Sequence, residues 1–373
     1  MEKHLHIISF DVPYPADYGG VIDVFYKIKA LHQLGVKIHL HCYEYGRGEQ
    51  PELNNFCEEV QYYHRCKGHE GFSHKLPYIV CSRSNKKLSE NLVQDNYPIL
   101  LEGIHCTYLL HDERFADRKI ILRLHNVEYK YYKQLFHHEK SLFKKLYYLY
   151  ESKLLKKYEK SIAQRSFIVA LTERDVEIYN TEFGTKNIFC LPAFTPFDKV
   201  VSNCETGCFC LYHGNLAVAE NEAVAIWLLK KVFNDTKIPF VIAGRKPSVK
   251  LFRVANRHPH TCIIPDPSAK EMQDLIEKAQ INILPSFNCT GIKLKLLNAL
   301  YNGKHCIVNE ETVRSTSLQS VCHVCDNASS FKETIDDLYD KPLDVEEKQL
   351  REKLLSEYFD NIKNAEKLVK SIW

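Results

Sequence analysis

The same order of elements occurs twice in this chain, at two points far apart in the sequence. Each time, a short apolar strand is followed by a glycine-containing loop and then by an amphipathic helix. The strands are residues 5–10 and 208–212, and the loops contain Gly20 and Gly214. A strand, a glycine loop and a helix in this order begin a parallel α/β domain. The repeat therefore predicts two such domains in one chain.

Further short apolar runs alternate with helical patterns in both halves of the chain. The predicted strands are residues 36–43, 99–102, 120–124 and 167–171 in the first half, and residues 240–243, 261–264, 281–284 and 305–308 in the second. At 373 residues the chain is also longer than one ordinary domain, which has about 100–200 residues. We expect an α/β protein with two Rossmann-like domains that face each other across a cleft.

A stretch that contains two prolines marks the predicted linker. Pro192 and Pro196 interrupt the alternation of strands and helices, because proline fits neither a helix interior nor a central strand. We place the first domain at residues 1–195 and the second at residues 196–354. We expect a C-terminal helix over residues 355–373 to pack back on the first domain.

Charge and hydropathy exclude several classes of protein. The 50 Lys and Arg residues and 47 Asp and Glu residues leave a net charge of +3, which is too balanced for a dedicated nucleic-acid binder. No apolar run reaches the roughly 18–20 residues that span a bilayer, and the first residues contain no apolar signal core. We expect a cytoplasmic protein that can attach peripherally to the inner face of the membrane.

The 14 cysteines do not follow the spacing of a disulfide framework. Two clusters invite a comparison with zinc sites, namely Cys204 with Cys208 and Cys210, and the segment Cys322-His323-Val324-Cys325. Neither shows the two paired ligand sets of a structural zinc. We favour reduced thiols and expect no cofactor and no metal.

Known phosphate and nucleophile motifs are absent. Neither glycine loop has the Gly-x-Gly-x-x-Gly dinucleotide fingerprint, and the chain has no P-loop and no Gly-x-Ser-x-Gly elbow. The strongest local signal lies instead where a predicted strand ends at Leu284 and a helix begins near Gly291. Lys293 and Lys295 fall in its first turn, where the helix dipole disfavours cations unless an anion is bound. The segment indicates an anion site, or alternatively a solvated basic turn.

Several motifs occur in one order over nearly the whole chain. They are Gly20, the segment Arg123-Leu124-His125-Asn126-Val127-Glu128-Tyr129, Gly214-Asn215, and the segment from Gly291 to Lys304 with Lys293, Lys295 and Asn298. This series resembles the GT-B glycosyltransferases of the large retaining family 4. The resemblance implies two Rossmann-like domains and a nucleotide-sugar held mainly by the C-terminal one.

The resemblance assigns roles residue by residue. His125 matches the family histidine close to the transferred sugar, and Lys293 and Lys295 match the positions that neutralise the leaving diphosphate. We list these three as catalytic; His125 could equally be a core histidine. The donor-binding residues implied are Gly19, Gly20, Gly214, Asn215, Thr290, Gly291 and Asn298. Arg245, after a C-terminal strand, could add charge to the phosphate site or lie in solvent.

The chain departs from the family at two positions eight residues apart. Many relatives carry glutamates there, whereas this chain has Thr290 and Asn298. A neutral amide bonds a ribose hydroxyl more weakly than a carboxylate does. The departure concerns the nucleoside contact more than the diphosphate contact.

A basic segment surrounds residues 140–160. Between Lys133 and Arg165 there are nine basic and three acidic residues, which gives +6. Leucines and tyrosines recur within it at helical spacing, a pattern typical of attachment to an anionic membrane surface and also of an amphipathic helix packed on its own domain.

The interpretation that combines these features is a hexosyl-type glycosyltransferase. It would move a sugar from a nucleoside-diphosphate-sugar donor to a hydroxyl of a glycan or lipid-linked acceptor in polysaccharide assembly, with retention. In that scheme the donor phosphate takes the acceptor proton, and we find no convincing pair of carboxylates. The alternatives are a GT-B sugar-nucleotide epimerase and a catalytically silent sugar-nucleotide-binding or assembly protein.

Overall fold

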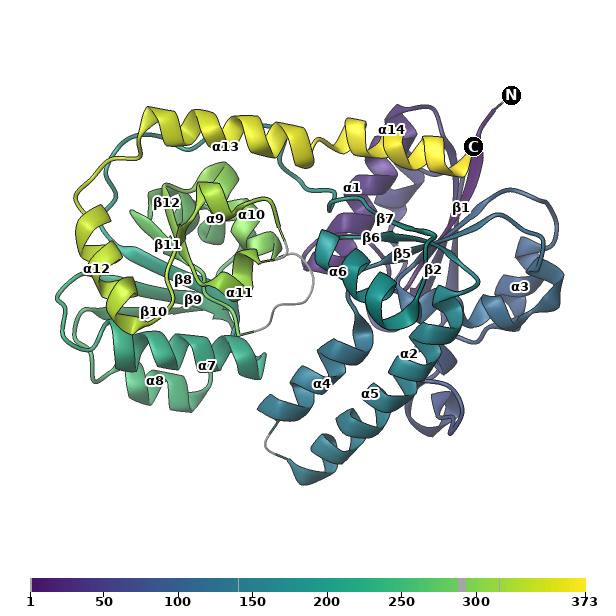
Figure 1. The fold of residues 1–373 in the computed structure, drawn as a ribbon, viewed down its shortest axis with the longest axis horizontal. Coiled ribbons are helices and arrows are strands. Elements are labelled where there is room, and N and C mark those ends of the chain that lie inside the picture. The colour runs from purple at the N-terminus through teal and green to yellow at the C-terminus, as the bar shows by residue number, and fades with distance from the viewer. Residues whose placement is uncertain (1, 140, 288–292, 315) are drawn as a thin grey trace. The chain divides into compact units, whose positions relative to one another are not determined.

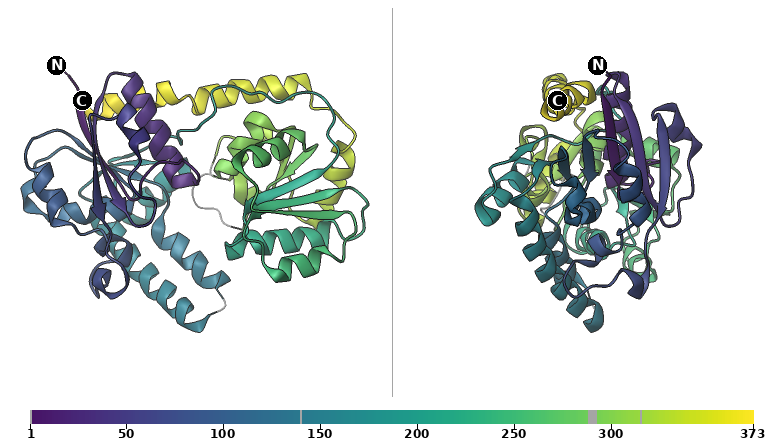
Figure 2. Two further views of the ribbon diagram at one scale, coloured as in Figure 1. Left: turned by 180° about the vertical axis from the view of Figure 1, so that it is seen from behind. Right: turned by 90° about the vertical axis from the view of Figure 1, so that its right-hand side faces the viewer.

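A computed structural model describes residues 2–139, 141–287, 293–314 and 316–373 of the chain. Within these residues the chain forms two compact units (Figure 1). Unit 1 contains the residues up to Pro196 together with Phe359–Trp373, and unit 2 contains the described residues from Phe197 to Tyr358. Each unit has its own parallel sheet with helices on both faces (Figure 2).

The sheet of unit 1 has seven strands in the order β3-β2-β1-β4-β5-β6-β7, and all neighbours are parallel. The strands are β1 (His4–Ser9), β2 (Lys37–Glu44), β3 (Glu59–His64), β4 (Ile99–Glu102), β5 (Ile120–Leu124), β6 (Phe167–Ala170) and β7 (Ile188–Cys190). The helices are α1 (Gly19–Gln33), α2 (Tyr78–Cys81), α3 (Lys86–Leu92), α4 (Glu128–His138), α5 (Leu142–Ala163), α6 (Glu173–Ile178) and α14 (Asn361–Ile372).

The sheet of unit 2 has six parallel strands in the order β10-β9-β8-β11-β12-β13. The strands are β8 (Cys210–Asn215), β9 (Phe240–Arg245), β10 (Thr261–Pro265), β11 (Ile281–Ile283), β12 (His305–Val308) and β13 (His323–Val324). The helices are α7 (Ala219–Trp227), α8 (Val249–Ala255), α9 (Ala269–Lys278), α10 (Leu294–Asn302), α11 (Glu310–Val313), α12 (Ala328–Leu338) and α13 (Val345–Tyr358). Two parallel sheets of this kind confirm the predicted fold class.

The C-terminal segment consists of two helices rather than one. Helix α13 ends at Tyr358, and the side chain of Asp360 caps α14 by accepting a hydrogen bond from the Lys363 amide at 2.9 Å. Ala365, Leu368 and Ile372 of α14 belong to the core of unit 1. This last helix therefore contributes directly to the packing of the N-terminal sheet.

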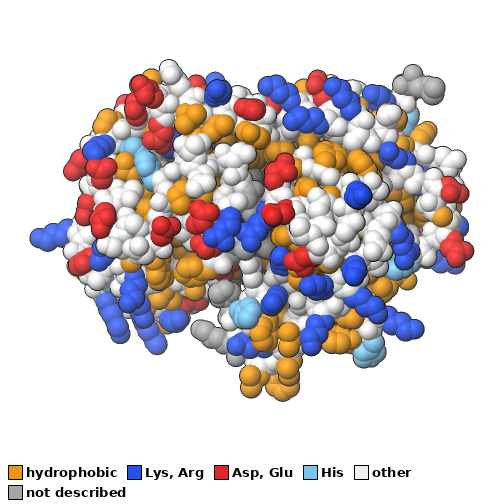
Figure 3. Space-filling model, in the orientation of Figure 1, with side chains coloured by type: hydrophobic (Ala, Val, Ile, Leu, Met, Phe, Trp, Pro, Cys, Tyr) orange, Lys and Arg blue, Asp and Glu red, His pale blue; other side chains and the backbone are white. Residues whose placement is uncertain are grey.

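Helices α4 and α5 lie side by side in unit 1. The second half of α5 is packed on the core, where Leu155, Tyr158 and Ile162 are buried. Its first half leaves Leu142, Phe143, Leu146 and Tyr150 exposed, and hydrophobic side chains gather at this lower end of the pair in Figure 3. The one segment thus combines a packed half with an exposed apolar half. No helix in the described ranges is long and apolar enough to cross a membrane.

Candidate functional site

The carboxyl edge of the sheet in unit 1 brings His125 next to Glu102. Glu102 is the last residue of β4 and pairs with Arg123 of β5, and His125 directly follows β5. The His125 Nε2 lies 2.9 Å from the Glu102 Oε2. Because an ionised carboxylate only accepts, the Nε2 carries the proton of this hydrogen bond. The neutral ring then has its lone pair on Nδ1.

Helix α1 completes a buried network of charges around this pair. The Lys27 Nζ lies 2.9 Å from the Asp23 Oδ2 and 2.7 Å from the Glu102 Oε1. Arg123 donates to the Asp23 Oδ1 at 3.1 Å and to the carbonyl oxygen of Leu191. The backbone amide of Phe194 also donates to Asp23, at 2.8 Å. Two carboxylates thus balance two cations, which is the condition for burying charges at acceptable cost.

Electrostatics keep both acids of this network ionised. Burial by itself raises the pKa of a carboxyl group, but the charges of Arg123 and Lys27 outweigh it and lower the pKa of Asp23. Lys27 and the hydrogen bond from His125 likewise lower the pKa of Glu102 against the effect of burial. Both acids are already paired, so the network holds His125 in place and offers no free carboxylic acid.

His125 was predicted from the sequence, but the two acids beside it were not. We predicted no pair of carboxylates for acid or base chemistry; Asp23 and Glu102 lie close together, but both are ion-paired to one lysine. A signal was present, because Glu102 and Arg123 are charged residues within apolar strands. Lys27 follows Asp23 by four residues on a buried face of α1, a spacing at which helical side chains meet.

Gly19 and Gly20 form the first residues of α1. A Cβ atom on Gly20 would lie 2.6 Å from the Phe10 Cζ, and the Phe10 and His125 rings are roughly perpendicular at a centroid distance of 5.3 Å. Tight packing against Phe10 therefore explains a glycine at position 20. A contact of Gly19 and Gly20 with a diphosphate stays a prediction.

In unit 2, the predicted glycine loop lies at the end of β8. Gly214 pairs with Gly244 of β9, and Asn215 pairs with Arg245. A Cβ on Gly214 would make only an ordinary contact with Asn221, at 3.5 Å, whereas one on Gly244 would lie 1.8 Å from the Gly214 carbonyl oxygen. The glycine that the backbone requires is therefore Gly244, which the sequence analysis did not single out.

Asn215 and Arg245 are exposed at this edge. The Asn215 Oδ1 accepts a hydrogen bond from the Ala217 amide at 3.1 Å, and the Asn215 carbonyl accepts one from the Asn221 Nδ2 at 2.9 Å. Asn215 thus shapes the turn between β8 and α7. This local role leaves its predicted contact with a donor untested.

Lys293 and Lys295 lie at the start of α10, as predicted from the sequence. Lys293 is the N-cap residue, and the first turn contains no acidic side chain. The Lys295 Nζ lies 4.9 Å from the centre of the Tyr212 ring of β8, a cation–π distance. This contact places the ammonium group beside the strand that ends in Gly214 and Asn215.

The surroundings of Lys295 disfavour its positive charge. Burial, together with the charge of Lys293, lowers the pKa of Lys295 to about 8, although Glu220 acts in the opposite direction. Burial and the charge of Lys295 also lower the pKa of the neighbouring His213 to about 3. The His213 Nε2 is buried and has no hydrogen-bond partner among the described residues. An anion bound here would offset the excess positive charge.

Two side chains hold the loop after β11 in place, one at the start of α7 and one at the start of α11. The Glu220 Oε1, in the first turn of α7, accepts hydrogen bonds from the Ser286 hydroxyl at 2.8 Å and the Phe287 amide at 3.1 Å. The Asn309 side chain, at the N-cap of α11, accepts from the Ser286 amide and donates to its carbonyl. Glu220 was another residue that the sequence analysis missed.

Two predicted donor residues, Thr290 and Gly291, lie outside the described residues. Asn298 is in α10, and its Oδ1 accepts a hydrogen bond from the Asn302 Nδ2 at 2.8 Å. A ribose hydroxyl that donated to Asn298 would have to share this oxygen. The structure therefore adds a local reason why Asn298 is a modest substitute for a glutamate.

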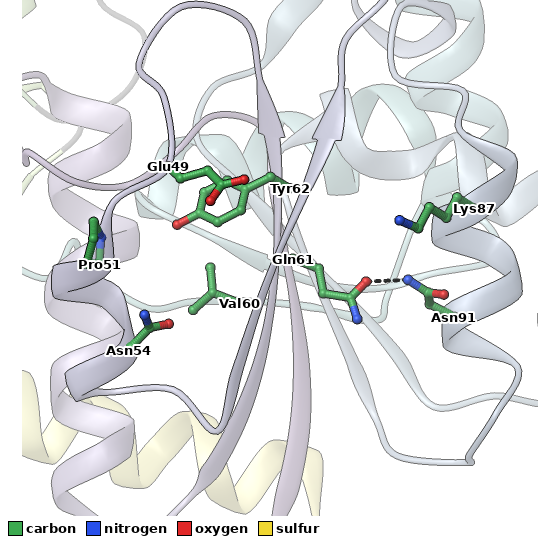
Figure 4. A pocket seen from close by; sticks show the side chains of 8 residues that line it. All are labelled: Glu49, Pro51, Asn54, Val60, Gln61, Tyr62, Lys87 and Asn91. Carbon is green, nitrogen blue, oxygen red and sulfur yellow. Dashed lines mark hydrogen bonds between the residues drawn. The ribbon is translucent and has the colours of Figure 1, made fainter.

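A cavity of about 450 Å³ lies at the edge strand β3. Figure 4 shows Gln61 and Tyr62 of β3 between Pro51 on one side and Asn91 of α3 on the other, with Asn91 donating to Gln61. None of the residues that line it in the described part of the chain is among the predicted site residues. We assign this cavity no role in the reaction.

No family model matches the chain. A curated relative from Klebsiella pneumoniae is described as an uncharacterized 44.6 kDa protein in the cps region. It is 30% identical over 315 residues, which are 79% of this chain and 80% of the relative.

Solved structures share the fold over almost the whole chain at low identity. HepE from Anabaena, in complex with UDP and glucose, is 9% identical with a TM-score of 0.66, and 99% of each chain is covered. A TarM variant from S. aureus, in complex with UDP and α-GlcNAc-glycerol, is 10% identical with a TM-score of 0.69 over 99% of each chain. WaaG, a glycosyltransferase involved in lipopolysaccharide biosynthesis, is 11% identical with a TM-score of 0.68 over 99% of each chain. The chain therefore has the GT-B fold, and it belongs to the same family as the Klebsiella pneumoniae protein of the cps region.

Proposed function

We propose that the chain is a glycosyltransferase that moves a sugar from a nucleoside-diphosphate donor to a hydroxyl acceptor, with retention. The observation that carries the proposal is the pair Lys293 and Lys295 at the start of α10, where burial and the charge of Lys293 lower the pKa of Lys295. The neighbours HepE and TarM were solved with UDP, and WaaG is a glycosyltransferase. These findings support a nucleoside diphosphate as the anion.

The reaction breaks the bond between the sugar's anomeric carbon and the diphosphate oxygen. A new bond forms from the same carbon to the acceptor oxygen, and in the retaining scheme the departing phosphate takes the acceptor proton. Negative charge develops on the diphosphate as it leaves. Lys293, Lys295 and the positive end of the α10 helix dipole would stabilise that charge without a divalent metal.

Unit 1 contributes His125 in this proposal, next to the transferred sugar by the family resemblance. The Glu102 and Asp23 network would fix the ring orientation and keep Nε2 protonated. Because both acids are buried and ion-paired, neither is free to act as the acid or base of an epimerase. The state of these two acids therefore gives no support to epimerisation.

We assign donor binding to unit 2 and the acceptor side to unit 1, with a glycan or lipid-linked sugar as acceptor. WaaG acts in lipopolysaccharide biosynthesis and the Klebsiella relative lies in a cps region. Both support a role in polysaccharide assembly.

We also propose that the exposed first half of α5 attaches to an anionic lipid surface. Leu142, Phe143 and Leu146 are 75%, 88% and 65% exposed, and Lys144 and Lys145 lie between them. Each lysine at an anionic surface contributes about 1 kcal/mol, and salt screens that attraction. Within the 140–160 segment, Lys140 lies outside the described residues.

Replacing Lys144 and Lys145 by glutamine should release the protein from anionic vesicles in co-sedimentation. The matched control replaces Lys156 and Lys157, which carry the same charge but lie farther along the helix, with Lys156 paired to Glu182 at 3.3 Å. We expect the control to bind nearly as well as the wild type. If the wild type never sediments with anionic vesicles, the exposed apolar half has another use and the membrane proposal fails.

The transferase proposal is tested with a panel of nucleotide-sugars. Thermal shift identifies which donors bind, and release of the nucleoside diphosphate is then measured with and without sugar acceptors. Release that depends on the acceptor, lost in Lys295→Ala and kept in the exposed control Lys250→Ala, is the expected result. Binding without release would indicate a silent binding protein, and interconversion of donors without release would indicate an epimerase.

A further inference from the structure

A cluster of two histidines and a glutamate lies at the other end of the sheet in unit 2. His305 is the first residue of β12, His323 begins the neighbouring strand β13, and Glu347 is on α13. One nitrogen of each ring and one carboxylate oxygen all lie within 4.8 Å of one another. The Glu347 Oε2 is 3.8 Å from both the His305 Nδ1 and the His323 Nε2. We call these residues the His-His-Glu cluster.

The two ring nitrogens that face Glu347, His305 Nδ1 and His323 Nε2, are buried and lack hydrogen-bond partners among the described residues. His305 is only 3% exposed. Most buried polar atoms in proteins are hydrogen-bonded, so two unpaired nitrogens at one place call for an explanation. A distance of 3.8 Å to the carboxylate is too long for a hydrogen bond.

The protonation state of His305 follows from its other nitrogen. The His305 Nε2 lies 2.9 Å from the Lys341 carbonyl oxygen. A carbonyl only accepts, so Nε2 carries the proton and the neutral ring presents a lone pair on Nδ1 to the cluster. A backbone carbonyl that binds the outer nitrogen of a histidine is the usual second partner of a metal ligand.

The carboxylate is held in the same manner. Arg351 of α13 is fully buried and donates to the outer oxygen of Glu347, Oε1, and to the Gly303 carbonyl oxygen at 3.2 Å. The inner oxygen, Oε2, is the one directed at both histidines. The two atoms that would bind a metal, His305 Nδ1 and Glu347 Oε2, therefore belong to groups whose other polar atom is already hydrogen-bonded.

We infer that the His-His-Glu cluster binds a zinc ion, with a water molecule as the fourth ligand. Zinc takes imidazole nitrogen and carboxylate oxygen at about 2.0–2.2 Å in tetrahedral geometry, which puts ligand atoms about 3.3–3.6 Å apart. The separations of 3.8 Å and up to 4.8 Å require only a small closure of the side chains. The site joins β12, the two-residue edge strand β13 and α13.

The position of the cluster separates it from the proposed reaction. His305 is at the amino end of β12, whereas Lys295, Gly214 and Asn215 lie with the carboxyl ends of the strands. The zinc would therefore take no part in the proposed transfer. It would fasten an edge strand that has little backbone pairing of its own, since β13 pairs with β12 through two residues only.

Metal content after dialysis and thermal unfolding test this inference. We expect one zinc per wild-type chain and none in Glu347→Gln or His323→Ala, with zinc intact in the control His258→Ala. Glu347→Gln is nearly isosteric, so it tests the site even if His323→Ala folds poorly. Zinc at a free concentration of 100 times its Kd should raise the midpoint of unfolding by about 5–10 °C in the wild type and leave Glu347→Gln unchanged.

Cobalt substitution adds a readout that depends on the ligands themselves. The visible spectrum of the Co²⁺ protein should show tetrahedral coordination in the wild type and lose it in Glu347→Gln. A wild-type chain without metal, or zinc retained by both cluster variants because the 14 cysteines hold it, would overturn the inference. So would loss of zinc in Cys322→Ser with retention in His323→Ala. Donor binding should persist in Glu347→Gln, so the transferase proposal stands or falls separately.

Discussion

Lys295 should make the affinity for a nucleoside diphosphate depend on pH in the alkaline range. Its pKa is lowered to about 8 by burial and by Lys293, whereas a lysine that contacts a phosphate must be protonated to bind strongly. Below pH 8 the free protein already holds this proton, so pH has little effect through Lys295. Above pH 8 binding has to take up a proton, and the affinity falls.

The size of the effect follows from the protonated fraction. With a pKa of about 8, about one tenth of the Lys295 side chains are charged at pH 9, which predicts a Kd about tenfold weaker than at pH 7. The charged contact itself is worth about 1.5–3 kcal/mol, or roughly ten- to one hundredfold in Kd. The affinity cannot fall by more than the value of this contact, so the loss of affinity levels off at still higher pH.

Isothermal titration with UDP between pH 7 and 9.5, at constant ionic strength, measures this directly. The control is Lys295→Arg, which stays charged and should show a flat profile. Lys295→Met should bind about ten- to one hundredfold more weakly at pH 7 and also show a flat profile. An identical alkaline loss in the wild type and in Lys295→Met would refute the reasoning, because the titrating group would then be elsewhere.

Three further outcomes follow from the structure. Lys27→Met leaves Asp23 and Glu102 without their shared cation and should lower the free energy of unfolding by about 3–5 kcal/mol, measured by denaturant titration; a loss under about 1 kcal/mol would contradict a tightly coupled network. Gly244→Ala should destabilise unit 2 strongly, because its Cβ would meet a backbone oxygen at 1.8 Å, while Gly214→Ala, with its nearest contact at 3.5 Å, should unfold almost like the wild type. Sugar transfer should survive EDTA at 25 °C, and an activity that only Mg²⁺ or Mn²⁺ restores would refute a metal-independent mechanism; restoration by Zn²⁺ alone would instead report on the His-His-Glu cluster.

Local sequence patterns predicted most of the two sheets. Strands such as β4 and β5 are short and mostly apolar because they are buried on both faces, and a nearly continuous apolar run is visible without knowing the fold. The edge strands β3, β7 and β13 were not predicted. Strand β3 reads Glu-Val-Gln-Tyr-Tyr-His and is only partly buried, and β13 has two residues, so neither carries a clear periodic signal.

The sequence by itself also determined which single residues stand at strand ends and helix starts. His125 after β5 and the lysines at α10 were identified in this way, since the placement of an element depends mainly on its own residues. Spacing in the chain likewise located the basic residues around α5. The spacing could not predict that one half of this helix packs on the core while the other half exposes Leu142 and Phe143.

Only the tertiary structure decided which of these residues meet. Glu102 reaches His125 because β4 and β5 are neighbours in the sheet, and Asp23 joins them from α1. His305, His323 and Glu347 likewise come together from three separate elements. Strand order and helix packing arise from burial of the whole chain, so contacts between distant segments leave no mark on local periodicity, and a site built from such contacts becomes visible only when the chain has folded.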